Sequence, residues 1–467
     1  MSSNVKPTAS ERPSGVRPDR TLLLVGLGTA LVLVTYVTPM ATVPLTAADL
    51  GSGAGTRAWI LSSMSVGLAA GLLTTGALGD ARGRRRVYVA GLVALGVGAL
   101  ACAGAPSGAV LVAARILQGL GGAAVLSCGL AVLAHGFPEP AARARATGVW
   151  GASVGVGITG GALLAAGLEV GSGWRETYLL TGVAALVLAL PSALGLAESA
   201  AERPRRPDLG GAVLLGAGLT LLVAGLTLVR GGLTVPVVVL LVAAALALVG
   251  FVAVERRVAD PMLELTLLAS PGFLGATVGA LAVGLGVIAM TSNVPLLVLV
   301  GLGGTLWAAT WLVVAWSATS VVTSLLLRRV RIPLDGPRTI AAALVVVGVG
   351  QLLGVGLGAG SSAWRLLPSM VVAGLASGVL NAVLGREAVA HVPPDRAAMG
   401  SGTNNTARYL GAACGITVFS VLVQHAGGST GPAALVDGWT VAVLVSTALS
   451  WVGAGVVLVA ARRAAGQ

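Results

Sequence analysis

Long apolar segments separated by short polar or charged clusters repeat along almost the whole chain. Each segment has about 20 residues or more, enough for a helix to cross the ~30 Å hydrocarbon core of a bilayer. Strands of a membrane β-barrel would instead alternate apolar and polar residues over about ten positions. The pattern predicts fourteen membrane-spanning helices, at residues 21–45, 57–79, 86–105, 109–134, 144–168, 176–197, 210–229, 233–254, 273–299, 303–327, 338–359, 365–390, 403–425 and 436–461.

The basic residues between these segments predict how the chain is oriented. Arginines gather in every second connection, as in RGRRR at 82–86 and RPRR at 203–206. Connections rich in Lys and Arg stay in the cytoplasm. An even number of spans then places both termini in the cytoplasm.

Two polar breaks in the middle of the chain predict its domain organisation. They are ESAAERPRRPD at 198–208 and ERRVADPMLEL at 255–265, and two very apolar spans lie between them. We expect a disordered cytoplasmic tail at 1–20 and a six-helix bundle at 21–197. Linkers with an inserted helix pair follow at 198–270, and a second six-helix bundle occupies 271–467.

Composition supports a membrane protein and argues against several other classes. Hydrophobic residues make up 56% of the chain and charged residues 10%, against roughly 25% charged in soluble domains. The net charge of +12 lies at the ends of apolar segments, without a basic face carrying interleaved aromatics, so we expect no nucleic-acid partner. The three scattered cysteines and three histidines fit no metal site, and no cofactor is expected.

The connection between the second and third spans, GALGDARGRRR at 76–86, carries more than positive charge. Its glycines permit a tight turn, and Asp80 can pair with an arginine or cap the next helix. The spacing of Gly76, Asp80, Gly83, Arg84 and Arg85 resembles the signature loop of the major facilitator superfamily, at the expected place.

Other stretches also resemble that superfamily, and in particular its fourteen-helix drug:proton antiporter branch. They are RILQGLGGAA at 115–124, GVWGASVGVGITGG at 148–161, Trp174-Arg175, DPMLELTLL at 260–268 and GSGTNNTARYLGAACG at 400–415. The resemblance implies two six-helix bundles around a central cavity that opens alternately to either side. It also implies export of drugs or metabolites driven by the proton gradient.

Two positions depart from the pattern of that branch. Thr35 stands where the first span usually carries an aspartate, and Val156-Gly157 stands where the fifth span usually has Gly-Pro. Both features are associated with proton-coupled antiport, so the chain is expected to export, with proton coupling left open. The alternatives are a proton-independent translocator of lipids or lipid-like molecules, and a membrane sensor that does not transport.

Four polar residues within or near the spans are candidates for coupling or gating. Arg115 and Gln118 share one face of the fourth span, and an intramembrane arginine usually marks a substrate or ion path; the alternative is an arginine that snorkels to the headgroups. Glu387 is the acid that falls within an apolar segment, either as a proton carrier or as a structural partner of Arg408 or Arg396. Arg408 is expected to act as a gate or structural residue.

The other polar and aromatic residues within the spans predict a mostly apolar cavity. The candidates for its lining are Thr35, Tyr36, Trp150, Asn293, Trp307, Trp311 and Asn381. Trp307 and Trp311 share a helix face and equally fit an interfacial anchor. Such a lining suits a hydrophobic or weakly polar small molecule better than a sugar or phosphate.

The prediction is therefore a transporter, not an enzyme, because no catalytic set can be assembled within a span. Its partners would be a small hydrophobic substrate, membrane lipids and, if coupled, protons, and the chain is expected to act as a monomer. Arginine almost replaces lysine, and Ala, Gly and Val dominate. This composition is typical of a GC-rich bacterium and predicts the bacterial plasma membrane.

Overall fold

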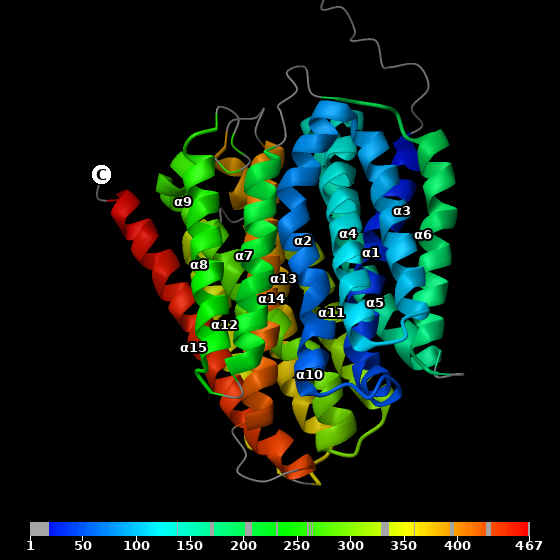
Figure 1. The fold of residues 1–467 in the computed structure, drawn as a ribbon. Helices are drawn as coiled ribbons and strands as arrows, with labels where there is room; N and C mark the ends of the chain where they lie inside the picture. Colours follow the sequence, from blue (N-terminus) through cyan, green and yellow to red (C-terminus); the bar gives the residue numbers. More distant parts are fainter. Residues whose placement is uncertain are drawn as a thin grey trace, which may run out of the picture.

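The computed structural model describes residues 18–137, 139–168, 172–200, 208–229, 232–258, 261, 263, 265–327, 336–358, 360–392, 397–425 and 431–465. This part of the chain is almost entirely helical, and the helices lie roughly side by side (Figure 1). They are α1 (Pro18–Asp49), α2 (Ala54–Arg82), α3 (Arg84–Ala103), α4 (Gly108–Gly136), α5 (Pro140–Gly167), α6 (Arg175–Gly195), α7 (Leu209–Leu228), α8 (Val235–Glu255), α9 (Pro271–Ala282), α10 (Ala289–Leu296), α11 (Leu306–Leu327), α12 (Gly336–Leu352), α13 (Leu367–Ala390), α14 (Ala397–His425) and α15 (Pro432–Ala465).

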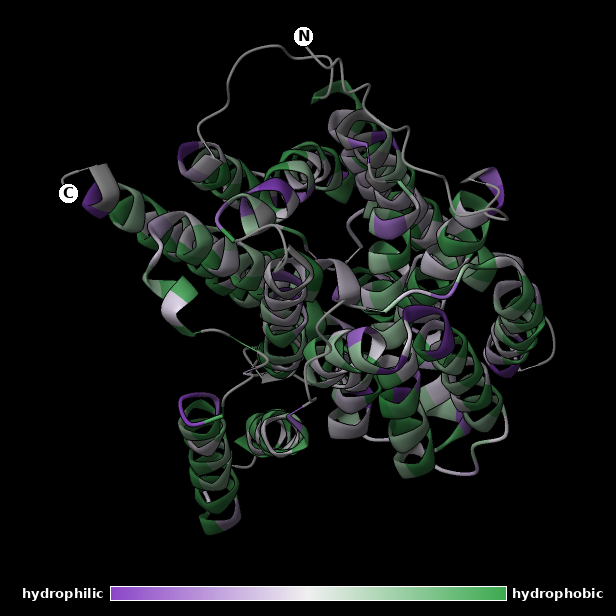
Figure 2. Cartoon of the chain, turned by 90° about the horizontal axis from the view of Figure 1, so that it is seen from above, coloured by the Kyte–Doolittle hydropathy of each residue, from purple (hydrophilic) through white to green (hydrophobic). Residues whose placement is uncertain are grey.

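The predicted spans correspond to these helices. Within the described residues, 13 helices are long and apolar enough to cross a membrane, and Gly336–Leu352 is a shorter apolar helix. The latter ends before the predicted limit of 359 because glycines follow, including Gly356 with φ 78° and Gly360 with φ 84°. Seen along the helices, hydrophobic residues colour most of their length and hydrophilic ones gather mainly at the ends (Figure 2).

One predicted span, 273–299, is a continuous helix with two wider turns. α9 and α10 are joined by a π-helical segment, Val283–Ile288, and a second one, Leu297–Gly301, follows α10. Short π segments within α-helices occur frequently at functional sites. Here the first of them contributes Val283 and Ile288 to the central cavity described below.

The helices pack in two groups. α1 to α6 contact one another, as do α9 to α15, and the two groups meet mainly where α2 contacts α14 and α5 contacts α11. The α7–α8 pair stands beside this core, with α7 against α2 and α14 (Figure 1). The ends of the described chain, Pro18 and Ala465, lie at the same end of the bundle, which we call the terminal face; the opposite end is the far face.

The contact between α2 and α4 depends on two glycines. A Cβ atom added to Gly119 would overlap the Met64 carbonyl oxygen and lie 2.8 Å from the Cα of Gly67. Small residues at such crossings let helix backbones approach closely, which is how helices associate in lipid. Any side chain at Gly119 would push α2 and α4 apart.

Gly119→Leu should therefore destabilise the folded protein by about 3 kcal/mol or more, as overpacking against backbone allows little relaxation. The measurement is thermal unfolding of the purified protein in detergent. Gly455→Leu is the matched control, because nothing lies within 4 Å of a Cβ at Gly455. Equal melting temperatures for the two variants would contradict the proposed role of this crossing.

Candidate functional site

A cavity of about 890 Å³, counting its open mouth, lies between the two groups of helices. Most of its lining is apolar, with residues from α1, α5, the π segment Val283–Ile288, α10, α11, α13 and α14: Leu33, Tyr36, Val37, Met40, Ala41, Val154, Ile158, Ala162, Val283, Ile288, Thr291, Pro295, Ala309, Thr310, Val313, Trp316, Ser377, Asn381, Arg408 and Tyr409. A lining of this character suits an apolar small molecule.

Aromatic rings form one wall of the cavity. The rings of Tyr36 and Tyr409 meet edge to face, with centroids 5.8 Å apart and an interplanar angle of 72°. The Tyr36 hydroxyl is hydrogen-bonded to Ser65 of α2 at 2.8 Å, and the Trp316 indole donates to Ser377 at 3.3 Å. These contacts join α1 to α14 and α11 to α13, so both helix groups hold aromatic surface toward the ligand space.

The charged and amide side chains of the lining are hydrogen-bonded to each other. The Arg408 guanidinium donates from Nη1 to the Asn381 side-chain oxygen at 3.0 Å, and Asn381 in turn donates to Ser320 at 3.4 Å. Asn381 is exposed although it lies within α13. At the far-face end, in contrast, Ala41, Ala165 and Leu306 belong to a buried apolar cluster. The cavity is therefore closed toward the far face in this conformation.

Of the seven residues predicted to line the cavity, Tyr36 and Asn381 do so and five do not. Thr35 donates to the Leu31 carbonyl of its own helix at 2.8 Å. Asn293 donates to Ala289 and accepts from Ser420, within the second group of helices. The remaining three are Trp150, Trp307 and Trp311.

Trp307 and Trp311 are 45% and 49% exposed on α11. They face away from the cavity, which corrects their predicted place in the lining. In a membrane their exposed rings fit the anchoring alternative instead. Trp316, on another face of α11, supplies the aromatic surface in the cavity.

Arg115 and Gln118 are fully buried within the first group of helices and are not among the residues that line the cavity. The Arg115 guanidinium donates to the Ile60 carbonyl at 2.6 Å and to the Tyr178 hydroxyl at 3.3 Å. This burial rules out the alternative of an arginine that snorkels to the headgroups. Arg115 thereby ties α4 to α2 and α6.

Glu387 lies at the terminal-face end of α13, outside the cavity lining. It pairs with Arg386 at 2.9 Å and lies 3.8 Å from the His391 imidazole. A Cβ at Gly336 would overlap its carboxyl group, so Glu387 packs against the first turn of α12. Arg408 bonds Asn381 instead, and the other predicted partner, Arg396, lies outside the described residues.

The turn between α2 and α3 has the geometry that its glycines predict. Gly83 adopts φ 108°, and Arg84, the next residue, bonds Asp80 through both Nε and Nη2 at 2.8 Å. The Asp80 and Arg84 side chains keep 27% and 18% of their surface exposed. The pair is therefore a half-exposed contact at the terminal face.

Glu198, which follows α6, contacts this turn, and the sequence pattern did not single it out. Its carboxylate accepts from the backbone N–H of Arg85 at 3.0 Å and lies 3.6 Å from both the Arg85 and Arg86 guanidinium groups. A carboxylate at a helix N-terminus is stabilised by the helix dipole. The sequence ESAAERPRRPD contains several acids, and nothing in the pattern indicated which of them contacts the α2–α3 turn.

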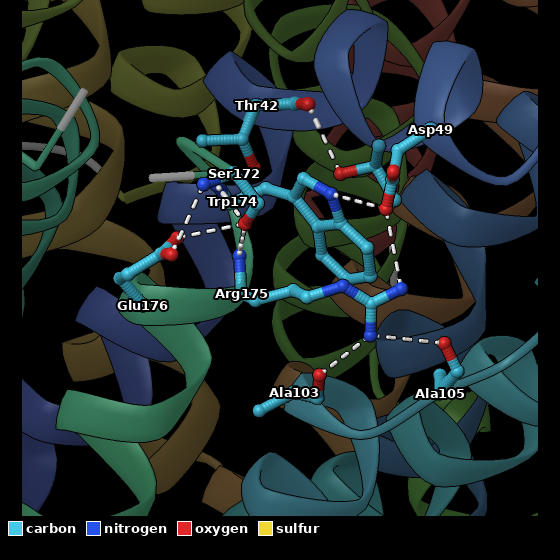
Figure 3. Close-up of polar contacts among 9 residues, drawn as sticks. Thr42, Asp49, Ala103, Ala105, Ser172, Trp174, Arg175 and Glu176 are labelled. Atoms are coloured by element: carbon cyan, nitrogen blue, oxygen red, sulfur yellow. Dashed lines mark hydrogen bonds and ion pairs between the residues drawn. The ribbon is translucent and has the colours of Figure 1, made fainter. Parts of the chain in front are cut away.

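A second polar cluster joins helix ends at the far face (Figure 3). Arg175 donates to the carbonyls of Ala103 and Ala105 at 2.8 and 3.1 Å and pairs with Asp49 at 3.2 Å. The guanidinium also stacks 4.3 Å from the Trp174 ring centre, and the Trp174 indole donates to Asp49. Arg175 thus connects the end of α1, the α3–α4 turn and the start of α6.

The family model of the Major Facilitator Superfamily matches residues 25–416. The chain belongs to this superfamily. The resemblance in the α2–α3 turn and the later motifs is thereby confirmed, together with the predicted fold of a multi-pass, all-α membrane protein. A member of this family is a transporter and not an enzyme.

Curated relatives include drug-export and resistance proteins. The probable actinorhodin transporter of Streptomyces coelicolor is 33% identical over 413 residues, covering 85% of this chain and 70% of that protein. The puromycin resistance protein pur8 of Streptomyces alboniger is 30% identical over 432 residues, covering 86% and 85%. The multidrug resistance protein Stp of Mycobacterium tuberculosis is 36% identical over 250 residues, covering 53% and 46%.

Solved structures show the same fold at low sequence identity. A POT family transporter has a TM-score of 0.69 at 14% identity, covering 95% of this chain and 96% of that one. The human organic anion transporter MFSD10 has a TM-score of 0.60 at 19% identity, covering 94% and 99%. At these identities the likeness shows the fold alone.

Arg175→Ala should lower the stability of the transporter by about 2 kcal/mol, because charge-assisted hydrogen bonds to two carbonyls and a carboxylate are lost. Thermal unfolding in detergent measures the effect. Arg365→Ala is the matched control, since Arg365 is an exposed far-face arginine that donates to the nearby Ser361 hydroxyl. If both variants melt alike, the cluster at Arg175 does not hold the helix ends together.

Proposed function

We propose that this transporter exports hydrophobic small molecules, such as drugs or antibiotic metabolites, by alternating access. The observation that carries the proposal is the cavity between the two helix groups, lined mainly by apolar and aromatic side chains. Binding near the midplane between two bundles is the arrangement on which alternating access depends. The names of the relatives, which include an actinorhodin transporter and puromycin and multidrug resistance proteins, support the substrate class.

In this proposal residues 21–197 and 271–467 rock against each other as two bundles, with 198–270 providing linkers and the inserted pair. The hydrogen bonds that must break for the cavity to open toward the far face are individually weak. Ser317 of α11 is bonded to Thr159 at 3.1 Å and to the Gly155 carbonyl at 3.3 Å, and Thr310 donates to the Ala162 carbonyl at 3.3 Å. Such neutral hydrogen bonds contribute about 1 kcal/mol each, so the α5–α11 contact can separate in each cycle.

We also propose the setting in which the protein works. It lies in a bacterial plasma membrane with the terminal face in the cytoplasm, acts as a monomer and binds no nucleic acid. The placement of arginines at helix ends supports this orientation. None of the described cavity-lining residues is Asp or Glu, so the proposal assigns no proton-carrying residue within the cavity.

Cells that contain the protein should expel the neutral lipophilic dye Nile red faster than cells without it. Met40→Trp should abolish the difference, because Met40 lines the cavity and the larger indole fills it. The matched control is Val459→Trp, at a position that is 51% exposed on α15. Efflux that is unaffected by Met40→Trp, or an absence of efflux for any of a panel of apolar dyes, would contradict the proposal.

The same assay with a protonophore decides how the export is driven. Proton-coupled export should stop when the gradient collapses, whereas the proton-independent alternative predicts unchanged efflux. A carrier of the second kind should also move a fluorescent lipid across the membrane.

Asp80→Asn should reduce Nile red efflux several-fold while leaving the melting temperature nearly unchanged. The substitution removes the charge that pairs with Arg84, which we propose helps to set the balance between the two orientations. A half-exposed pair contributes at most about 1 kcal/mol to folding. Asp437→Asn, at an exposed acid near the far face, serves as control, and wild-type efflux in Asp80→Asn would refute the role.

A further inference from the structure

Arg408, the charged residue of the cavity lining, indicates which class of molecule binds there. Arg408 lies in the lining, and no Asp or Glu does among the described lining residues. A cation in a low-dielectric wall attracts negative charge and repels positive charge much more strongly than it would in water. An apolar cavity with this single charge therefore favours anions over cations.

Arg408 has hydrogen-bonding capacity that the protein leaves unused. Its Nη1 donates to Asn381, but its Nε is buried with no partner among the described residues. A guanidinium presents five donors in a planar fork that matches a carboxylate. Because Arg408 lines the cavity, an acidic ligand there can accept from the guanidinium N–H groups that face it.

Several other donors of the lining are already engaged. The hydroxyls of Thr291 and Ser377 donate to carbonyls of their own helices at 2.8 and 2.7 Å. Thr310 donates to the Ala162 carbonyl and the Trp316 indole to Ser377. Arg408, in contrast, keeps guanidinium donors for a ligand, and it is the charged donor of the lining.

The surroundings of Arg408 leave its charge uncompensated. The nearest acid along α13 is Glu387, six residues beyond Asn381 and therefore about 9 Å further along the helix axis. Glu387 is already paired with Arg386. A second buried cation, Arg115, bonds a carbonyl and a tyrosine hydroxyl rather than a carboxylate.

We propose that the substrates of this transporter are aromatic molecules with an acidic group, such as a carboxylate or phenolate. The acidic group binds Arg408, and the aromatic body lies along Tyr36, Tyr409 and Trp316. This inference rests on the proposed function for the act of transport, but it concerns what the cavity binds. It predicts that lipophilic cations are poor ligands.

Fluorescein and rhodamine 123 form a suitable pair of probes, because they share a ring system and differ in charge. Fluorescence anisotropy with the purified full-length protein should show about tenfold or more tighter binding of the anion. Arg408→Gln should remove this preference, and Arg408→Lys should retain most of it. Arg256→Gln is the control, an exposed arginine at the end of α8.

Asn381→Asp tests the proposal without removing the arginine. The new carboxylate would lie beside Arg408 and neutralise it, so fluorescein should bind more weakly and rhodamine 123 more tightly. This variant keeps the size of the side chain, and thermal unfolding of each variant checks that it is folded. A preference that is unchanged in both Asn381→Asp and Arg408→Gln would overturn the proposal.

The other outcomes separate this inference from the proposed function. Equal or tighter binding of rhodamine 123 by the wild-type protein overturns the inference, as does failure to bind either dye, while Nile red efflux would still establish export. Tight, Arg408-dependent binding of fluorescein in a protein that expels no dye from cells would support the ligand class and refute export.

Discussion

Close contact between helix backbones is the constraint on which the rest of this structure depends. Lipid is as apolar as a leucine side chain, so helices in a membrane gain little from hydrophobic burial and associate through van der Waals packing. Glycines supply that packing in both bundles. Gly91 and Gly121 bring α3 to α4, Gly415 brings α14 to the π segment before α10, and Gly378 brings α13 to α11. Part of the high glycine content of the chain, 69 residues, thus serves helix packing.

The cavity forms where this close packing is interrupted. Tyr36, Tyr409 and Trp316 contribute rings to its lining, and the rings of Tyr36 and Tyr409 meet edge to face. The π segment at Val283–Ile288 belongs to the same region. A wider helical turn rotates the side chains that follow it relative to those before it. The same helix can therefore pack tightly against its neighbours in one part and line the cavity in another.

Hydropathy predicted the spans well because lipid allows only helices or closed barrels, which makes span length nearly independent of tertiary detail. The same property limited the prediction of the site. Lipid-facing and cavity-facing sides of a span are both apolar, so the periodicity that marks a buried face in a soluble protein is weak. Trp311 and Trp316 illustrate this, since their sequence context is alike and yet one faces outward and the other into the cavity. Tyr36, Asn381 and Arg408 could be found because a polar group within a span needs a reason to be there.

The polar contacts of the protein are of two kinds. Buried contacts hold the helices of one bundle together, and weaker contacts can break during transport. Arg115 is fully buried and bonded across three helices, and breaking these bonds would leave its charge without hydrogen-bond partners in a low dielectric, which favours movement of α2, α4 and α6 as a unit. The bonds from Thr159 to Ser317 and from Thr310 to the Ala162 carbonyl join α5 to α11 across the two bundles, and they are neutral hydrogen bonds of about 1 kcal/mol each. A transporter that alternates between two orientations needs both: strong contacts inside each bundle to keep the cavity walls in shape, and weak ones between the bundles so that neither orientation is too stable to leave. Arg115 meets the first requirement within the first bundle, and the α5–α11 bonds meet the second between the bundles.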